Sequence, residues 1–328
     1  KDPSTEGGLD NNAYTNVMVS WLLARAIDVL DILADDERRR LCERIELSDK
    51  EVERFDMLSR KLFVPFHDGN IISQFEGYDR LREFDWQGYR AKYGDIQRLD
   101  RILEAEGDDP NNYKVSKQAD VLMLFYLFSS DEVIQVLQRL GFEFSERDIE
   151  DNIDYYLQRT SHGSTLSFIT HAWVLARTDR AQSWQLALKA LDADIGDVQG
   201  GTTAEGIHLG AMAGTVDLFQ RCYLGVELRA GALMFNPRLP EEVRKLDATV
   251  RYRGQILDLS LTQEVLTVSS RPMTAHPITI AYRGHTREVS PGQSYSFRLV
   301  PEAERRKGGR GPTPPQQPQD AFGEKEIA

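Results

Sequence analysis

The apolar residues of the chain change their spacing near Gly225, and this change limits the folds that the chain can adopt. Before Gly225 they recur three and four positions apart, as on one face of a helix. After it, short runs of β-branched and aromatic residues alternate with Arg-Gly and Pro-Gly turns, a pattern typical of strands. The sequence therefore predicts a helical domain over residues 1–224, a small antiparallel β-sandwich over residues 225–300, and a disordered, charged Pro/Gln-rich tail over residues 301–328.

The helical domain is predicted to consist of helical hairpins that close into a barrel or toroid. Residues 63–109 break the helical rhythm and are interpreted as a long loop, which is ordered because its aromatic content is high. The expected strands are residues 248–252, 255–261, 264–269, 278–282 and 295–300. The expected helices are residues 14–33, 36–47, 49–62, 117–128, 130–140, 145–157, 164–176, 183–191 and 207–219.

Composition excludes several classes of partner. The formal net charge is -12 and the pI is about 5.1, which argues against binding of nucleic acid or an anionic membrane surface. The most apolar run, residues 121–128, is far shorter than the roughly 20 residues that span a bilayer, and no signal peptide is visible. Cys42 and Cys222 lie in helical patterns, as expected of a reduced cytoplasmic protein. We expect no metal and no bound cofactor, because zinc, Walker and Rossmann spacings are missing.

Two turns rich in hydroxyl and imidazole groups each precede a predicted helix. Residues 159–164 read Arg-Thr-Ser-His-Gly-Ser, and residues 200–208 read Gly-Gly-Thr-Thr-Ala-Glu-Gly-Ile-His. Such a turn offers free N–H groups, side-chain donors and the positive end of a helix dipole to an anion such as phosphate. Either turn alone could simply cap a buried helix. Together they are predicted to form two walls of one pocket.

A second set of polar residues suits a sugar. Residues 63–78 interleave aromatic rings with His67, Gln74 and Glu76, so that rings could cover the apolar faces of a sugar while polar groups bind its hydroxyls. The alternative is a loop folded over the helices, in which these groups are only hydrogen-bonded. Lys117 and Gln118 begin a very apolar helix, where a lysine opposes the helix dipole. A lysine there suits a pocket that holds hydroxyls or an anion, although a solvated helix end would also explain it.

Five segments resemble, in order, the signatures of glycoside hydrolase family 65, which includes the inverting phosphorylases of maltose, trehalose, kojibiose and nigerose. The resemblance runs from Asp10 to about Val300. It implies an (α/α)6-barrel catalytic domain, here partial, followed by a C-terminal β-sandwich; the N-terminal β-sandwich and linker helices of the family are absent from this chain. The segments are residues 10–16 (DNNAYTN), 73–78 (SQFEGY), 117–121 (KQADV), 160–164 (TSHGS) and 201–208 (GTTAEGIH).

The implied reaction is phosphorolysis: an α-glucoside and inorganic phosphate give β-glucose 1-phosphate and a free acceptor sugar. Phosphate is then the nucleophile and co-substrate, so the protein supplies an anion cradle in place of a catalytic base. By resemblance, phosphate binding is assigned to Ser161, His162, Thr202, Thr203 and His208, with Arg159 a weaker candidate. Lys117 and Gln118 match the residues that contact glucose at the cleaved end, and His67, Gln74 and Glu76 fall in a loop that would line the acceptor side.

One departure from the family pattern concerns the general acid. In the family this acid is a glutamate in a Gly-Pro-Asp-Glu-aromatic segment shortly before the first signature, and residues 1–9 do not contain that segment. Glu6 does not match it. We therefore expect the glutamate upstream of Lys1, and we expect the upstream part of the same enzyme to be needed for turnover. The resemblance also suggests a homodimer.

Two other functions stay open. A family hydrolase acting on trehalose or kojibiose would use a carboxylate base to activate water instead of a phosphate cradle. Residues 160–164 contain no carboxylate, but Glu205 keeps this alternative open. A non-catalytic carbohydrate-binding or structural fragment is the third possibility, motivated by the missing acid.

Overall fold

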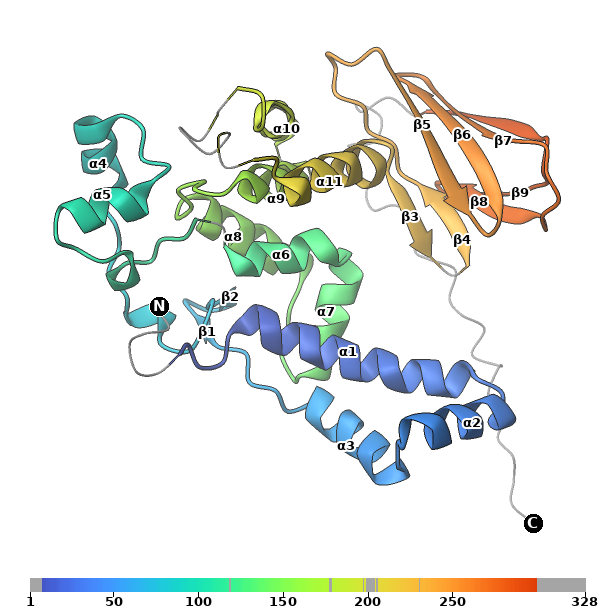
Figure 1. Ribbon diagram of the computed structural model, residues 1–328, viewed down its shortest axis with the longest axis horizontal. Helices are drawn as coiled ribbons and strands as arrows, with labels where there is room; N and C mark the ends of the chain where they lie inside the picture. The colour runs from blue at the N-terminus through green and yellow to red at the C-terminus, as the bar shows by residue number, and fades with distance from the viewer. Residues whose placement is uncertain are drawn as a thin grey trace. The chain divides into compact units, whose positions relative to one another are not determined.

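The computed structural model describes residues 8–117, 119–176, 179–196, 198, 204, 206–229 and 231–299. The chain divides into two compact units, Lys1–Gly214 and Thr215–Ala328, which are drawn together in Figure 1 and are treated separately below. Gln118, Thr202, Thr203, Glu205 and the tail at residues 301–328 lie outside the described residues. The predicted domain boundary at residue 224 stays a prediction.

The first unit is helical, as the spacing of apolar residues predicts. Several helices begin where side chains cap their free N–H groups. Asn12 accepts a hydrogen bond from the Thr15 N–H at 2.9 Å, and Ser129 and Glu132 form a capping box. The helices are α1 (Ala13–Ile32), α2 (Asp35–Ile45), α3 (Asp49–Ser59), α4 (Trp86–Tyr93), α5 (Leu99–Ala105), α6 (Asp120–Leu127), α7 (Ser130–Arg139), α8 (Glu146–Leu157), α9 (Thr165–Leu175), α10 (Arg180–Asp192) and α11 (Leu209–Asp217).

The apolar helix α6 forms the centre of the core of this unit. Val121, Leu122, Leu124 and Phe125 are fully buried, and α6 packs against α1, α7, α8 and α9 (Figure 1). The expected start of this helix at Lys117 was wrong, because the helix begins at Asp120. Before the helix, Ser116 pairs instead with Thr160 in the segment that leads to α9.

Residues 63–109 hold more structure than a loop. A small hairpin of β1 (Phe66–His67) and β2 (Ile71–Ile72) is followed by the 3-10 turn η1 (Tyr78–Arg80) and by α4 and α5. The helices α4 and α5 were not predicted, because they are only eight and seven residues long and show no sustained period. A separate aromatic and aliphatic cluster around Phe84 packs this part of the chain.

The second unit is a sandwich of two four-stranded sheets, ordered β10-β7-β6-β5 and β3-β4-β8-β9. Buried residues of both sheets form one core. Pairing is antiparallel except between β4 and β8, which are parallel, so the expected antiparallel sandwich contains one parallel pair. The strands are β3 (Val226–Arg229), β4 (Ala232–Phe235), β5 (Lys245–Tyr252), β6 (Gln255–Thr262), β7 (Val265–Ser270), β8 (Ile278–Tyr282), β9 (His285–Val289) and β10 (Ser294–Arg298).

Three of these strands, β3, β4 and β9, were not expected from the sequence. The edge strands β3 and β9 are mostly exposed and carry charged residues, so they lack a regular apolar alternation. Two hairpins in this unit turn through an Arg-Gly pair with both residues at positive φ, at Arg253 and at Arg283. Among the described residues, no helix is long and apolar enough to cross a membrane.

Candidate functional site

The turn before α9 lies beside the segment that precedes α6. The Ser161 N–H donates to the Ser116 carbonyl at 2.9 Å, and the Ser116 N–H donates to the Arg159 carbonyl at 3.0 Å. A parallel bridge joins Ser116 and Thr160. Lys117, which comes next, therefore lies beside the Ser161 turn, and two groups of sequence-predicted site residues come together at the starts of two helices.

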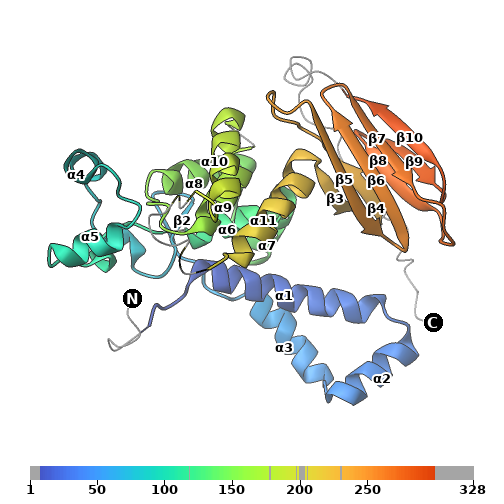
Figure 2. The same cartoon turned by 45° about the horizontal axis from the view of Figure 1, so that its top comes forward.

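Helix α11 begins at the same end of the unit as α9. Its Gly210 and Gly214 face Leu166 and Ile169 of α9, at 3.6 and 2.9 Å from an ideal Cβ position. The earlier glycine faces the earlier residue of α9 and the later glycine faces the later one, so the two helices run in the same direction. They lie side by side in both views (Figures 1 and 2). His208, just before α11, is thus at the same end as the turn at residues 159–164.

The start of α1 completes this end of the unit. The Ala13 N–H donates to the Gln74 carbonyl at 2.9 Å, and the Gln74 side-chain oxygen accepts from the Asp120 N–H at 3.4 Å. The Asn11 amide donates to the Glu76 carboxylate at 2.7 Å. Four helices, α1, α6, α9 and α11, therefore begin close to the sequence-predicted residues. We call this end the helical rim, defined by residues 10–13, 74–76, 116–120, 159–167 and 208–210.

The sequence Ser-His-Gly-Ser is explained by the tightness of its turn. His162 has a left-handed backbone, with φ of 57°. A Cβ at Gly163 would lie 2.7 Å from the Gln97 carbonyl oxygen and 3.1 Å from Cγ of Lys117. A side chain at residue 163 is thus sterically excluded by backbone, and glycine allows the turn to pack against Lys117.

Hydrogen bonds determine which nitrogen of His162 carries its proton. Nδ1 of His171 lies 2.7 Å from the Ser167 carbonyl, which can only accept, so this nitrogen is protonated. The same N–H points to the Ser167 hydroxyl oxygen at 3.2 Å. The hydroxyl is then free to donate its own hydrogen to Nδ1 of His162 at 2.8 Å. His162 is therefore protonated on Nε2.

Burial keeps this pair of imidazoles neutral. Desolvation, with a contribution from the neighbouring His171 and from Lys189 and Arg90, lowers the pKa of His162 to about 3. Burial likewise lowers the pKa of His171 to about 4, against a hydrogen bond to Ser167 that raises it. Lys189 and Arg90 are the cations among the groups that lower the pKa of His162.

His208 is held by a carboxylate at the start of α11. Its Nδ1 lies 2.6 Å from Oδ1 of Asp194, and its backbone N–H donates to Oδ2 of the same residue at 2.9 Å. These hydrogen bonds lower the pKa of Asp194. Because a carboxylate only accepts, Nδ1 of His208 carries a proton. The orientation of this imidazole is fixed from a residue fourteen positions earlier.

Lys117 is also held by a carboxylate. Its ammonium group lies 2.8 Å from Asp100 and its side chain is half exposed. Burial raises the pKa of Asp100, but hydrogen bonds from Arg98 and Lys117 outweigh this effect and bring the pKa to about 2. The lysine before α6 is therefore stabilised by a carboxylate rather than by the helix end, and it stays accessible from the rim.

Arg159 and His67 belong to a second cluster beside the rim. The guanidinium of Arg159 makes two 3.1 Å hydrogen bonds to Glu83 and lies 3.8 Å from the centre of the Tyr155 ring. His67 packs its ring edge-on against Tyr155, and its Nδ1 is 2.7 Å from the Ser73 hydroxyl. Arg159 and His67 thus both lie against the ring of Tyr155. Its assignment to phosphate stays a prediction, although two of its donors already bind Glu83.

The Ser161 hydroxyl lies 3.4 Å from the Ser116 carbonyl, and Ser161 is 7% exposed. Sequence reasoning missed Ser167, His171 and Asp194. The first two share a helix face, four residues apart on α9, and that spacing could have indicated them. Asp194 carries no such local signal. The assignments of Gln118, Thr202 and Thr203 lie outside the described residues.

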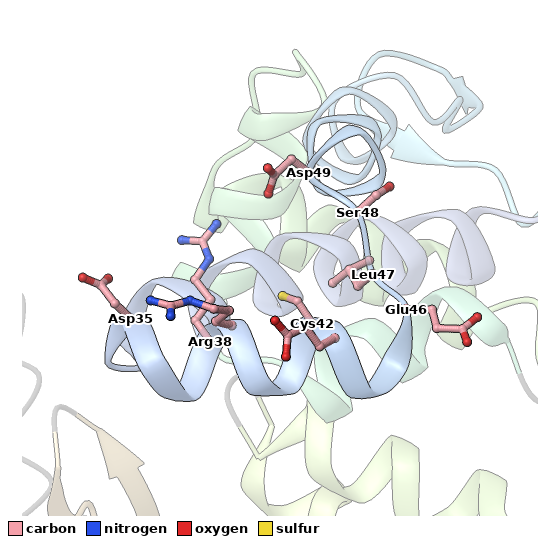
Figure 3. A pocket seen from close by; sticks show the side chains of 9 residues that line it. Asp35, Arg38, Cys42, Glu46, Leu47, Ser48 and Asp49 are labelled. Atoms are coloured by element: carbon pink, nitrogen blue, oxygen red, sulfur yellow. The ribbon is translucent and has the colours of Figure 1, made fainter.

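A hollow of about 610 Å³ lies elsewhere in the first unit, between α2 and the start of α3 (Figure 3). Its lining mixes charges of both signs, including Arg38, Glu43 and Asp49, around Cys42. Arg38 and Arg39 are paired with Asp31 and Asp36. None of the sequence-predicted site residues lines this hollow.

Comparison with known proteins decides the family. Residues 4–217 match the model of the glycosyl hydrolase family 65 central catalytic domain, and residues 226–289 match the C-terminal domain of the same family. The chain belongs to glycosyl hydrolase family 65. The family and the fold class expected from the sequence, part of an (α/α)6 barrel followed by a β-sandwich, are thereby confirmed.

Family 65 relatives include several phosphorylases. The chain is 52% identical over 287 residues to an uncharacterized glycosyl hydrolase of Mycobacterium tuberculosis, covering 88% of this chain and 22% of the relative. It is 35% identical to trehalose 6-phosphate phosphorylase of Lactococcus lactis, covering 83% and 34%. It is 29% identical to kojibiose phosphorylase of Halothermothrix orenii, covering 80% and 32%. The chain thus spans between a fifth and about a third of the length of these family 65 relatives.

A solved family 65 structure shares the fold. A protein described as a kojibiose phosphorylase, from the human microbiome, matches with a TM-score of 0.70 at 18% identity. The match covers 90% of this chain and 40% of that protein. Helical barrel segment and β-sandwich therefore follow each other in both chains.

Proposed function

We propose that this chain provides the phosphate-binding part of a family 65 enzyme that carries out inverting phosphorolysis of an α-glucosidic disaccharide. The reaction gives β-glucose 1-phosphate and a free acceptor sugar. One observation carries the proposal: the partly buried, neutral His162, whose Nδ1 accepts a hydrogen bond from the Ser167 hydroxyl, lies in the turn beside Lys117 at a rim where helices begin.

The rim suits a phosphate nucleophile. Phosphate must approach the anomeric carbon on the face opposite to the leaving oxygen, and its oxygens need donors rather than a base. The His162 Nε2–H is one such donor. The start of α9 is proposed to supply others, because the Ser164 side chain does not cap this helix. The Ser167 N–H already donates to the Ser164 carbonyl at 3.0 Å. Thr202, Thr203 and His208 are proposed to complete the cradle.

A neutral donor has a mechanistic advantage here. A protonated imidazole would hold phosphate more strongly but would also withdraw charge from the oxygen that attacks. A neutral N–H orients the dianion while leaving it nucleophilic. The half-exposed Lys117, with Gln118, is proposed to hold the hydroxyls of the glucose, and His67, Gln74 and Glu76 to line the acceptor side.

Hydrolysis is the competing reaction. It requires a carboxylate that activates water on the face where phosphate would attack. Glu205, the carboxylate that keeps this alternative open in the sequence, lies outside the described residues. The general acid is not assigned to any of the described residues.

The test is an assay of the protein as its gene encodes it, with trehalose, trehalose 6-phosphate, kojibiose, nigerose and maltose. Each glucoside is incubated with and without inorganic phosphate, and products are followed by phosphorus and proton NMR. We expect β-glucose 1-phosphate, formed only with phosphate, from one of these substrates. Free glucose released without phosphate would replace the proposal by hydrolysis, and sugar binding without either product would indicate a binding module.

A further inference from the structure

A hollow of about 320 Å³ lies in the second unit, between the two sheets of the sandwich. The edge strand of one sheet, β9, and the edge strand of the other, β10, both border it, together with the turn that leads into β9. We call it the edge hollow. Its lining residues are Tyr282, Arg283, His285, Arg287, Tyr295, Ser296, Phe297 and Arg298.

Two basic residues of β9 face the inside of the sandwich. Arg287 is paired in register with Ile280, and His285 with Tyr282. Directly opposed residues of an antiparallel pair lie on the same face of the sheet, and both Ile280 and Tyr282 belong to the buried core. Arg287 and His285 therefore extend from the core face at its open edge. Phe297 of the other sheet, which is 9% exposed, forms part of the apolar floor.

The arginines of the edge hollow lack anionic partners. Throughout the described residues, Arg283, Arg287 and Arg298 make no ion pair, whereas Arg271 of the same unit binds Asp258 at 2.8 Å. Residues 272–299 contain a single carboxylate, Glu288. Glu288 follows Arg287 on β9, so it lies on the opposite face of the strand. In a chain of net charge -12, this hollow gathers positive charge that no ion pair compensates within the part of the chain that the structure describes.

Charged side chains at edge strands also protect a sheet from pairing with other chains. One charged side chain on each edge strand would be enough to prevent such pairing. Here the residues that line one concave space include three arginines, a histidine and aromatic rings, from both sheets and a turn. Bringing like charges together is unfavourable unless an anion offsets them, so the arrangement indicates a ligand.

We propose that the edge hollow binds a small phosphate monoester or free phosphate, independently of the helical rim. Guanidinium groups match phosphate oxygens with two parallel hydrogen bonds each. The volume of about 320 Å³ lies at the lower end of ligand pockets, which are roughly 300–1,000 Å³. The partly buried Tyr295 offers a ring for the organic part of such a molecule.

The experiment is calorimetric titration of the whole chain with inorganic phosphate, glucose 6-phosphate and, as a neutral probe, glucose. Arg287→Ala combined with Arg298→Ala removes two of the three guanidiniums. Arg253→Ala is the control, because it removes an exposed guanidinium of the same unit that does not line the edge hollow. The double variant should weaken phosphate binding at the edge hollow about tenfold or more without changing any binding at the rim, and the control should bind as the parent does.

Salt and conservative substitution sharpen the result. Binding at exposed guanidiniums should weaken steeply between low and high NaCl, and Arg287→Lys with Arg298→Lys should retain only part of the affinity. Equal affinity for both phosphate probes would identify the free anion as the ligand, and tighter glucose 6-phosphate binding would identify a sugar phosphate. Unchanged titrations in the double variant, or increased light scattering as its only effect, would overturn the proposal.

Discussion

The helical rim and the edge hollow both gather donors for an anion, but they are built in opposite ways. At the rim, His162 is neutral, largely buried and oriented by Ser167, which His171 orients in turn. In the edge hollow, Arg283, Arg287 and Arg298 are charged, exposed and without ion-pair partners among the described residues.

The contrast between fixed neutral donors and exposed charged donors indicates what each site can do. Donors held in place by buried hydrogen bonds bind a phosphate in one orientation, and the strength of that binding depends little on salt. A reaction in which phosphate attacks an anomeric carbon requires such a fixed orientation. Exposed guanidiniums attract any phosphate in reach, and their strength falls as ionic strength rises. We therefore expect chemistry at the rim and reversible binding at the edge hollow, and the following changes test that contrast.

The largest effect is expected from His162→Ala. It removes the oriented N–H, and loss of one such donor costs about 100-fold in turnover. The comparison variant is His276→Ala, which alters an exposed histidine of the second unit. Phosphorolysis rates at saturating sugar measure the effect. A His162→Ala enzyme as active as the parent would remove the rim from the mechanism.

The next effect concerns the turn that carries His162. Gly163→Ala would place a Cβ 2.7 Å from a backbone oxygen of Gln97, and the resulting strain should lower the free energy of unfolding by about 1–3 kcal/mol. Gly210→Ala is the matched control, since its nearest atom is a leucine methyl at 3.6 Å. Urea denaturation measures both. Equal stability of the two variants would mean that the turn is less tightly packed.

A smaller effect is expected from Ser167→Ala. Without the hydroxyl, Nδ1 of His162 loses its partner and the imidazole can adopt the other tautomer, which should lower kcat/KM about tenfold. Ser183→Ala is the control, because it removes another buried hydroxyl, bonded to the Ala172 carbonyl at 2.6 Å. Nitrogen NMR of the histidines reports the tautomer directly. If Ser167→Ala leaves the tautomer unchanged, Ser167 acts only in packing.

The last test is a dependence of stability on pH, which leaves activity at neutral pH unchanged. In the folded state the pKa values of His162 and His171 are about 3 and about 4, below about 6.5 in the unfolded chain. The unfolded state therefore takes up protons first as the pH falls, so stability is complete above pH 6.5 and declines below it. The slope is at most about 1.4 kcal/mol per pH unit for each histidine.

Thermal melts between pH 6.5 and 4.5 measure this decline. Carboxylates with lowered pKa values, such as Asp100 at about 2, change the stability mainly below this pH range. His171→Gln should flatten the profile. An identical slope in that variant would show that His171 is not buried as a neutral group.

Much of the fold could be predicted because its signals are local. The spacing of apolar residues in α1, α7, α8 and α9, and the capping residues before α1, α7 and α8, determine helices within short windows. The strands β5 to β8 alternate clearly. The short helices α4 and α5 and the exposed strands β3 and β9 escaped prediction because their stability depends on neighbours supplied by the rest of the unit.

The candidate site divides in the same way. The residue types of the turn around His162 indicated an anion site, and the order of motifs indicated the family, because both are written in consecutive residues. Which groups meet was decided by tertiary structure: Asp100 binds Lys117, Asp194 binds His208, and Glu83 binds Arg159 across 76 positions. A carboxylate is stabilised by any cation that folding brings near it. The distance between the two groups in the folded protein cannot be read from a single sequence. The sequence predicted which residues are hydrogen-bond donors, and the packing of the helices determined which of them lie at the rim.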